Sequence, residues 1–102
     1  MSGNPLLSGL KPTHPGEFLR EDVLPSIDIS KTEVARRLGI SRAMLYAILD
    51  EKAPVSPAMA LRLGRLFGAT PESWLNLQRD YDLRMLEPAM KEELDGITPV
   101  AA

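Results

Sequence analysis

Apolar residues in the middle of the chain recur at helical spacing in two short segments, residues 31–38 and 42–49, which a glycine separates. The inward stripes of these two segments consist of Val34, Ala35, Leu38, Leu45, Ile48 and Leu49. Gly39 lies between them and can take the left-handed conformation that ends a helix at little cost. The pattern predicts two helices joined by a very short turn, the arrangement of a helix-turn-helix.

Polar residues at the starts of the two segments support this interpretation. Ser30 and Ser41 are expected to cap the two helices, and Glu33, three residues after Ser30, completes a capping box. Ala35 is small where two steeply crossed helices would touch, so a larger side chain would push them apart. A small residue, a glycine and buried aliphatic residues at fixed offsets favour a DNA-binding unit over an ordinary helical hairpin, which is the alternative.

Three further helices are predicted around this pair, and the chain has no strand-like alternation. They run from Pro15 to about Leu24, where Pro25 ends the helix; from Pro57 to Phe67, between Ser56 and Gly68; and from Pro71 to about Leu86, after Thr70 and before Glu87-Pro88. The fold class is therefore all-α with five helices. We expect a flexible arm at residues 1–13, a helix-turn-helix domain at 14–86 and an acidic, partly disordered tail at 87–102.

The net charge of −2 is unevenly distributed along the chain. Residues 1–28 carry a net −2, residues 29–66 a net +4 and residues 67–102 a net −4. The basic middle suits phosphate. The acidic end suits a basic partner or serves solubility.

Seven residues are candidates for DNA contact: Lys31, Thr32, Ser41, Arg42, Ala43, Tyr46 and Lys52. In a helix-turn-helix the first residues of the second helix reach base edges, while the first helix lies over the backbone. Arg42 is the candidate base reader, because a guanidinium pairs bidentately with guanine, and Ala43 could pack on a thymine methyl group. The other candidates are expected to contact phosphate or sugar.

Four charged residues near this surface are harder to assign. Arg36 and Arg37 point away from the predicted core and could form either a solvated face or phosphate contacts. Asp50 and Glu51 follow the second helix, where acidic groups oppose the helix dipole and repel phosphate. They are the only support for another interpretation, an interaction module whose helix-turn-helix does not bind DNA.

Little in the chain suggests catalysis, a cofactor or a metal site. There is one histidine and no cysteine, and no spacing of acidic residues resembles a metal site. His14, directly before Pro15, is expected to be structural or solvated. The N-terminus lacks the pattern of a signal peptide, and no segment approaches the roughly 20 apolar residues of a membrane span. We therefore expect a cytoplasmic binding protein, not an enzyme, without cofactor, metal or membrane.

The predicted last helix is apolar on more than one side. Trp74, Leu77 and Tyr81 follow one stripe, while Leu75 and Leu83 point elsewhere. Such a helix often packs against a second subunit, which predicts a homodimer through the Trp74–Leu77–Tyr81 region that reads two DNA half-sites about 34 Å apart. The alternative is that the helix packs on its own core, and for Trp74 alone we favour this alternative.

Four stretches of the chain together resemble the HigA family of antitoxins, within the λ-repressor-like superfamily. They are HPGEFLREDVLP at 14–25, the helix-turn-helix itself, KAPVSPAMALRLGRLFG at 52–68 and WLNLQRDYDL at 74–83. The resemblance implies a five-helix DNA-binding fold and a homodimer. It further implies a protein that neutralises a HigB-type, mRNA-cleaving toxin and represses its own operon at a palindromic operator.

One departure from the family pattern and one rival function remain. Family members often carry Asn-Gly where this chain has Asp50-Glu51, which puts the loop geometry and phosphate contacts there in doubt. The resemblance does not fix the toxin-binding surface; the N-terminal arm with the first helix and the acidic C-terminal part are the two candidates. The rival function is a stand-alone phage-type repressor that has no toxin partner.

Overall fold

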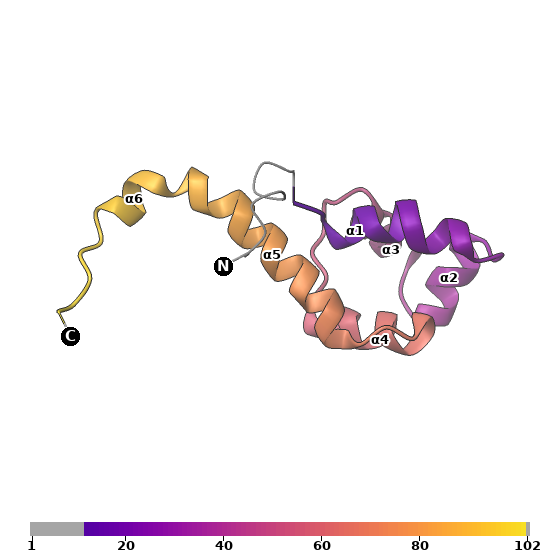
Figure 1. The fold of residues 1–102 in the computed structure, drawn as a ribbon. Coiled ribbons are helices and arrows are strands. Elements are labelled where there is room, and N and C mark those ends of the chain that lie inside the picture. The colour runs from indigo at the N-terminus through magenta and orange to yellow at the C-terminus, as the bar shows by residue number, and fades with distance from the viewer. Residues whose placement is uncertain (1–11, 102) are drawn as a thin grey trace.

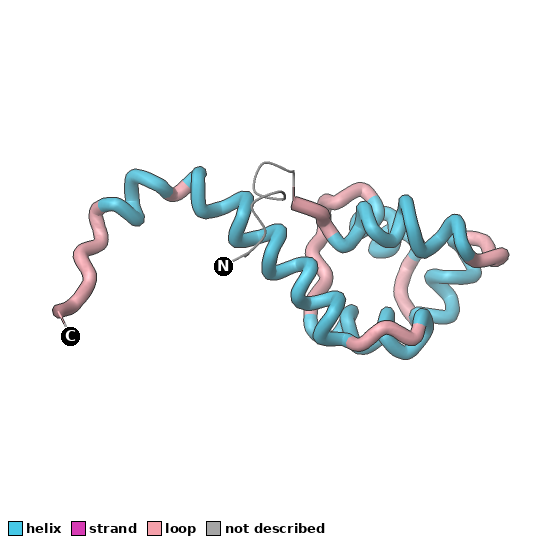
Figure 2. Tube along the Cα trace, in the orientation of Figure 1, coloured by secondary structure: helices cyan, strands magenta, loops and turns pink. Residues whose placement is uncertain are grey.

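The computed structural model describes residues 12–101, and every regular element in this range is helical (Figures 1 and 2). The elements are α1 (Pro15–Phe18), the π-helical turn η2 (Leu19–Val23), the 3-10 turn η3 (Leu24–Ser26), α2 (Lys31–Leu38), α3 (Arg42–Leu49), α4 (Pro57–Phe67), α5 (Pro71–Ala89) and α6 (Lys91–Asp95). This confirms the all-α class. The expected arm lies outside the described residues up to residue 11.

The predicted helix starts are confirmed by side-chain caps. The hydroxyl oxygens of Ser30, Ser41, Ser56 and Thr70 each accept a hydrogen bond, at 3.0–3.1 Å, from the backbone N–H three residues later. Each cap satisfies one of the four N–H groups that a helix start leaves unpaired, an arrangement typically worth about 1 kcal/mol. The boundaries of α2 and α3 are therefore those that the sequence pattern predicts.

Two proline-based helix ends are predicted wrongly. The first helical segment does not stop before Pro25, because a π-helical turn and a 3-10 turn carry it on to Ser26. The last long helix continues through Pro88 to Ala89 instead of ending at Leu86. A proline removes one hydrogen-bond donor, but Pro25 lies at the start of a short 3-10 turn and Pro88 next to an exposed helix end, where this loss costs little.

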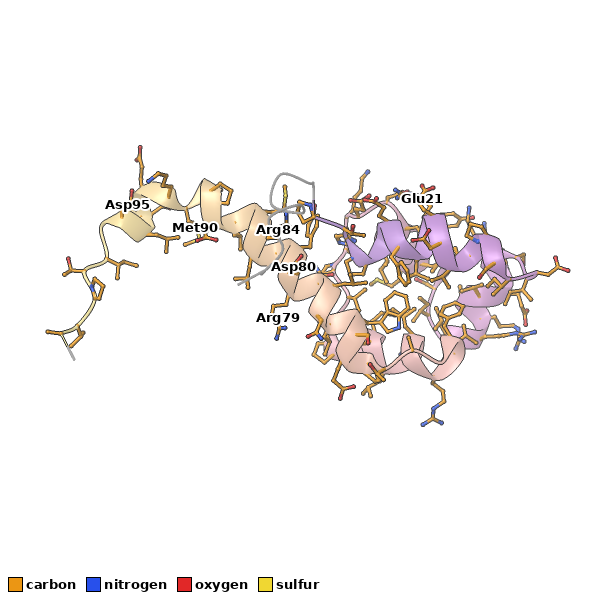
Figure 3. The ribbon with its side chains drawn as sticks, viewed as in Figure 1. Glu21, Arg79, Asp80, Arg84, Met90 and Asp95 are labelled. Carbon is orange, nitrogen blue, oxygen red and sulfur yellow. The ribbon has the colours of Figure 1, made fainter. Side chains whose placement is uncertain are left out.

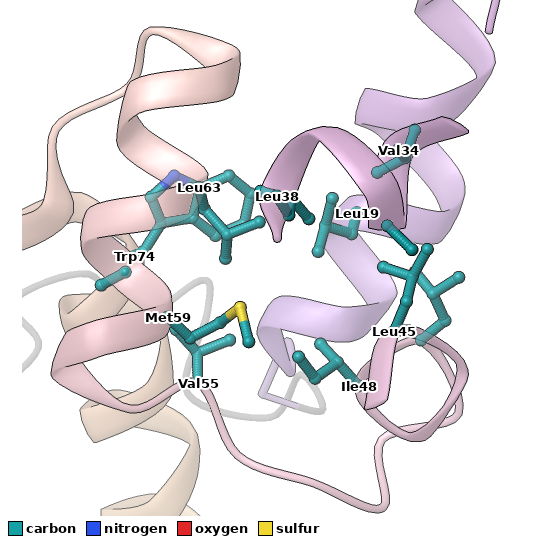
Figure 4. Packing of buried hydrophobic residues seen from close by; sticks show 12 residues of the cluster. Leu19, Val34, Leu38, Leu45, Ile48, Val55, Met59, Leu63 and Trp74 are labelled. Carbon is teal, nitrogen blue, oxygen red and sulfur yellow. The ribbon is translucent and has the colours of Figure 1, made fainter. Parts of the chain in front are cut away.

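The core gathers residues from η2, α2, α3, α4 and α5 (Figure 4), and Phe18 of α1 packs against it. Its largest fully buried side chains include Leu19 from η2, Leu45 and Ile48 from α3, Leu63 from α4 and Trp74 from α5. Burying such side chains stabilises a fold by about 1.5–3 kcal/mol each. Trp74 is only 1% exposed, so the interpretation of Trp74 as a core residue is confirmed.

The N-terminal segment lies very close to the end of α3. A Cβ atom at Gly16 would lie 1.8 Å from the backbone oxygen of Ile48, so only glycine allows this approach. His14 is 3% exposed and caps α1, because its Nδ1 accepts a hydrogen bond from the Gly16 N–H at 2.8 Å. Its ring also meets Tyr81 of α5 edge-on at 4.8 Å, so His14 is a structural residue.

The C-terminal half of α5 and the short α6 leave the helical body and project away from it (Figure 1). This projection gives the chain its elongated dimensions of 53 × 27 × 23 Å. The two residues that Figure 3 labels near its end, Met90 and Asp95, lie far from the packed side chains of the body.

Candidate nucleic-acid interface

The outer face of α3 exposes the start of the helix. Ser41, Arg42, Ala43 and Tyr46 are all exposed, whereas Leu45, Ile48 and Leu49 are buried as predicted. Sequence reasoning missed Met44, whose side chain is 43% exposed beside Arg42 and Ala43. A methionine at helical spacing from buried leucines looks like a core residue, so no local signal distinguished it.

Two candidate residues from different helices lie together. The Lys31 ammonium group at the start of α2 stands 5.8 Å from the centre of the Tyr46 ring on α3, a cation–π distance. Thr32 is exposed in the same first turn of α2, and Lys52 is exposed in the turn after α3. The starts of both helices therefore form one exposed surface, with Lys52 in the turn that follows α3.

The base-reading candidate carries an unused charge. Within residues 12–101, Arg42 has no ion-pair or side-chain hydrogen-bond partner, and neither has Lys52. Free cations of this kind attract phosphate or base acceptors without first giving up a bond inside the protein.

The ends of α2 and α3 are held by arginines that lie outside the helix-turn-helix. Arg62 of α4 donates to the carbonyl oxygens of Leu38 at 2.6 Å and Gly39 at 3.4 Å, which end α2. Arg20 of η2 donates to the Leu49 carbonyl oxygen at the end of α3. Positive groups at helix C-termini satisfy unpaired carbonyls and oppose the negative end of the dipole. The C-terminal ends of both helices are therefore held by side chains from other elements of the chain.

Only one of the two acidic residues after α3, Asp50 and Glu51, has a side chain that is exposed and unpaired among the residues that the structure describes. Glu51 takes a left-handed backbone conformation with φ 62°, and its carboxylate pairs with Arg20 at 3.3 Å. Its side chain is only 20% exposed. Asp50 remains exposed as the C-cap residue of α3. One of the two acidic groups is thus paired with an arginine, which also binds Glu21 at 2.9 Å.

Glu33 has a different role from the one the capping box predicts. Its backbone N–H is capped by Ser30, but its carboxylate binds Arg36 at 2.5 Å and Arg37 at 2.8 Å. Hydrogen bonds from Arg36, the larger contribution, and from Arg37 lower the pKa of Glu33 to about 2. Arg36 and Arg37 therefore share a counter-ion on the surface of α2 and are not free cations.

Neither a metal-binding cluster nor a membrane-spanning helix is found among residues 12–101. The described part of the chain holds no group of three or more histidine, aspartate or glutamate side chains that could bind a metal ion. Among the same residues, no helix combines the length and apolar character needed to cross a bilayer.

The model of the helix-turn-helix family matches residues 19–75, more than half of the chain. The Pseudomonas aeruginosa antitoxin HigA, solved with the higBA promoter, is 37% identical, with a TM-score of 0.81 over 88% of this chain and 99% of that one. This chain belongs to the HigA family of helix-turn-helix proteins. The antitoxin GraA in complex with its operator is also similar to this HigA-family chain, at 40% identity and a TM-score of 0.83 over 92% and 96% of the two chains. Virulence-associated protein I of Dichelobacter nodosus is 39% identical over 88 residues, which cover 86% of this chain and 81% of that protein.

Proposed function

We propose that this HigA-family chain represses its own operon by binding a palindromic operator as a homodimer, and that it neutralises a HigB-type, mRNA-cleaving toxin by direct binding. The observation that carries the DNA-binding part is the exposed start of α3, where Arg42 has no partner within the described residues. Arginines at the C-terminal ends of α2 and α3 hold both helices in place. The solved complexes of HigA with a promoter and of GraA with its operator support the same role.

In this proposal each candidate residue has a defined contact. Arg42 reads a base edge from the start of α3, with Ser41 and Ala43 beside it, and Met44 is added to this group because of its exposure. The remaining contacts, to phosphate and sugar, come from Lys31, Thr32, Tyr46 and Lys52. The Lys31–Tyr46 contact brings a cation of α2 and an aromatic ring of α3 together on this surface.

The proposed homodimer uses a smaller part of α5 than the sequence suggested. Trp74 lies in the core of its own chain, so its side chain cannot face a second subunit. Leu77 and Tyr81 are half-buried and remain available, and they are the proposed centre of the dimer contact. A two-fold axis there would present two α3 helices to successive major-groove half-sites.

The test is a binding titration of the purified protein against its own promoter fragment and a scrambled fragment. Arg42→Ala should cost about 1–3 kcal/mol on the promoter, roughly a 5- to 150-fold loss, and little on the scrambled DNA. Arg79→Ala, which changes an exposed arginine on α5, is the matched control and should bind like the wild type. Equal binding of both fragments by the wild type, with no effect of Arg42→Ala, would instead support an interaction module.

A second measurement separates an antitoxin from a stand-alone repressor. The chain is co-expressed with the small protein encoded beside it, and the pair is purified through a tag on that protein. Co-purification, together with relief of the growth arrest that the neighbour causes alone, supports the antitoxin function. Operator binding without either result would favour the stand-alone repressor.

A further inference from the structure

A basic groove lies between the C-terminal end of α2 and the outer face of α4. It is lined by Arg37, Leu38, Leu61, Arg62, Arg65 and Leu66, and we name it the arginine groove. Leu61 is 63% exposed within it. Arg65 has no partner within residues 12–101, and Arg62 binds only neutral carbonyls. The groove therefore combines an uncovered apolar floor with uncompensated positive charge.

A second surface on the same chain has the opposite character. Residues 86–97, here named the acidic arm, expose Leu86 by 52%, Met90 by 37% and Leu94 by 39%. Met90 forms the junction between α5 and α6, but its N–H donates to the Leu86 oxygen and its oxygen accepts from the Leu94 N–H, each at 2.9 Å. These bonds keep helical spacing across the junction, so the three residues lie along one side of the projecting segment. Residues 87–95 carry one lysine against four acidic residues, a net charge of −3. The acidic arm therefore presents an apolar stripe flanked by negative charge.

The acidic arm cannot reach the arginine groove of its own chain. Figure 1 shows α6 and α2 at opposite ends of the molecule, and the continuous helix α5 holds them apart. Pairing of two acidic arms would place like charges side by side, which disfavours that contact. The arginine groove of another copy matches the acidic arm in both apolar character and charge.

We propose that the acidic arm of one copy docks in the arginine groove of a second copy, with Leu94 on Leu61 and acidic side chains of α6 against Arg62 and Arg65. The proposal rests on surfaces of this chain and does not require that it binds DNA or a toxin. The contact joins unlike surfaces, so it links copies head to tail unless a two-fold arrangement closes it. It does not use Leu77 and Tyr81 of α5, so it is compatible with the proposed dimer contact.

The absence of cysteine from the chain allows a direct test by cross-linking. Leu61→Cys and Leu94→Cys each introduce one thiol at an exposed position, so neither change should disturb the fold. The two full-length variants are mixed, oxidised and separated without reductant, with different tags to distinguish the copies. The proposal expects a disulfide-linked heterodimer as the main product. Glu72→Cys replaces Leu94→Cys in the control mixture, because Glu72 is exposed but lies at the other end of α5.

Charge reversal tests the same contact from the other side. Arg65→Glu in the groove copy should reduce cross-linking roughly tenfold, and Glu93→Arg in the arm copy should restore it. Cross-linking no stronger than the Glu72→Cys control, or Leu94→Cys copies linked mainly to each other, would overturn the proposal. A third outcome would also overturn the proposal: the Arg65→Glu variant cross-links as well as the wild-type groove but binds a single DNA half-site more weakly. The groove would then hold DNA phosphate.

Discussion

Substitution of Gly16 tests whether the close approach of α1 to α3 fixes the position of the candidate recognition helix. The new Cβ of Gly16→Ala would lie 1.8 Å from the Ile48 oxygen and 2.8 Å from its carbonyl carbon. Ordinary contact needs about 3.5 Å, so the two backbone segments must separate by about 1.5–2 Å. Neither atom belongs to a side chain that could rotate away, which places the cost at or above the upper end of overpacking, about 3 kcal/mol.

Thermal unfolding followed by circular dichroism measures this cost. In a domain of this size about 3 kcal/mol corresponds to a fall in Tm of roughly 10–20 °C. Gly96→Ala is the matched control, because its Cβ would meet nothing closer than 3.4 Å and its φ is −79°, so Tm should move little. A Tm for Gly16→Ala within two degrees of the wild type would refute the steric argument.

Three further predictions concern the residues that support α3 and α5. Glu51→Gly and Glu51→Ala both lose the ion pair with Arg20, but only glycine relieves the strain of the left-handed backbone at this position. Denaturant unfolding should therefore find the glycine variant more stable than the alanine variant by about 1 kcal/mol. Gln78 accepts the Val55 N–H at 2.7 Å, so Gln78→Leu should cost about 1–3 kcal/mol, while Gln78→Glu keeps an acceptor and should cost less. Burial lowers the pKa of His14 below its ordinary 6.5, so the unfolded chain takes up the proton first and stability should fall as pH drops below 6.5. His14→Asn keeps a capping side chain and should flatten this slope of stability against pH; an unchanged slope would show that His14 is not its source.

Local periodicity predicts the helices well, because each helix start is set by residues three positions apart. Ser30 and Ser41 cap their helices as expected, by accepting the N–H groups of Glu33 and Met44, whereas the Glu33 carboxylate binds arginines and does not complete the capping box. The ends of α2 and α3 depend instead on distant residues. Arg62 reaches Leu38 across 24 positions, and no pattern of single residues reveals such a contact.

Ion pairs and helix-end contacts leave fewer free cations on the candidate interface than the net charge of +4 over residues 29–66 suggests. Residues 29–66 contain seven basic side chains, but Arg36 and Arg37 bind Glu33, and Arg62 holds the end of α2. Arg65 lies in the arginine groove. The candidate interface keeps three cations for DNA: Lys31, Arg42 and Lys52.

The number of cations that contact phosphate determines how steeply the DNA-binding constant falls as the salt concentration rises. When the logarithm of the binding constant is plotted against the logarithm of the salt concentration, affinity for B-DNA falls with a slope of about −0.9 per neutralised phosphate. Lys31 and Lys52 are the cations proposed to contact phosphate, so the four lysines of a homodimer give a slope of about −4. If all seven basic residues of each subunit contacted phosphate, the slope would be about −13. Titrations on the promoter fragment across several salt concentrations distinguish the two values, and Lys52→Ala should reduce the slope by about 2 because both subunits change. A slope near −13 would refute this division of the charges. The same holds if Arg36→Ala reduces the slope as much as Lys52→Ala does, because the ion pairs of Glu33 would then open on DNA and its arginines would contact phosphate.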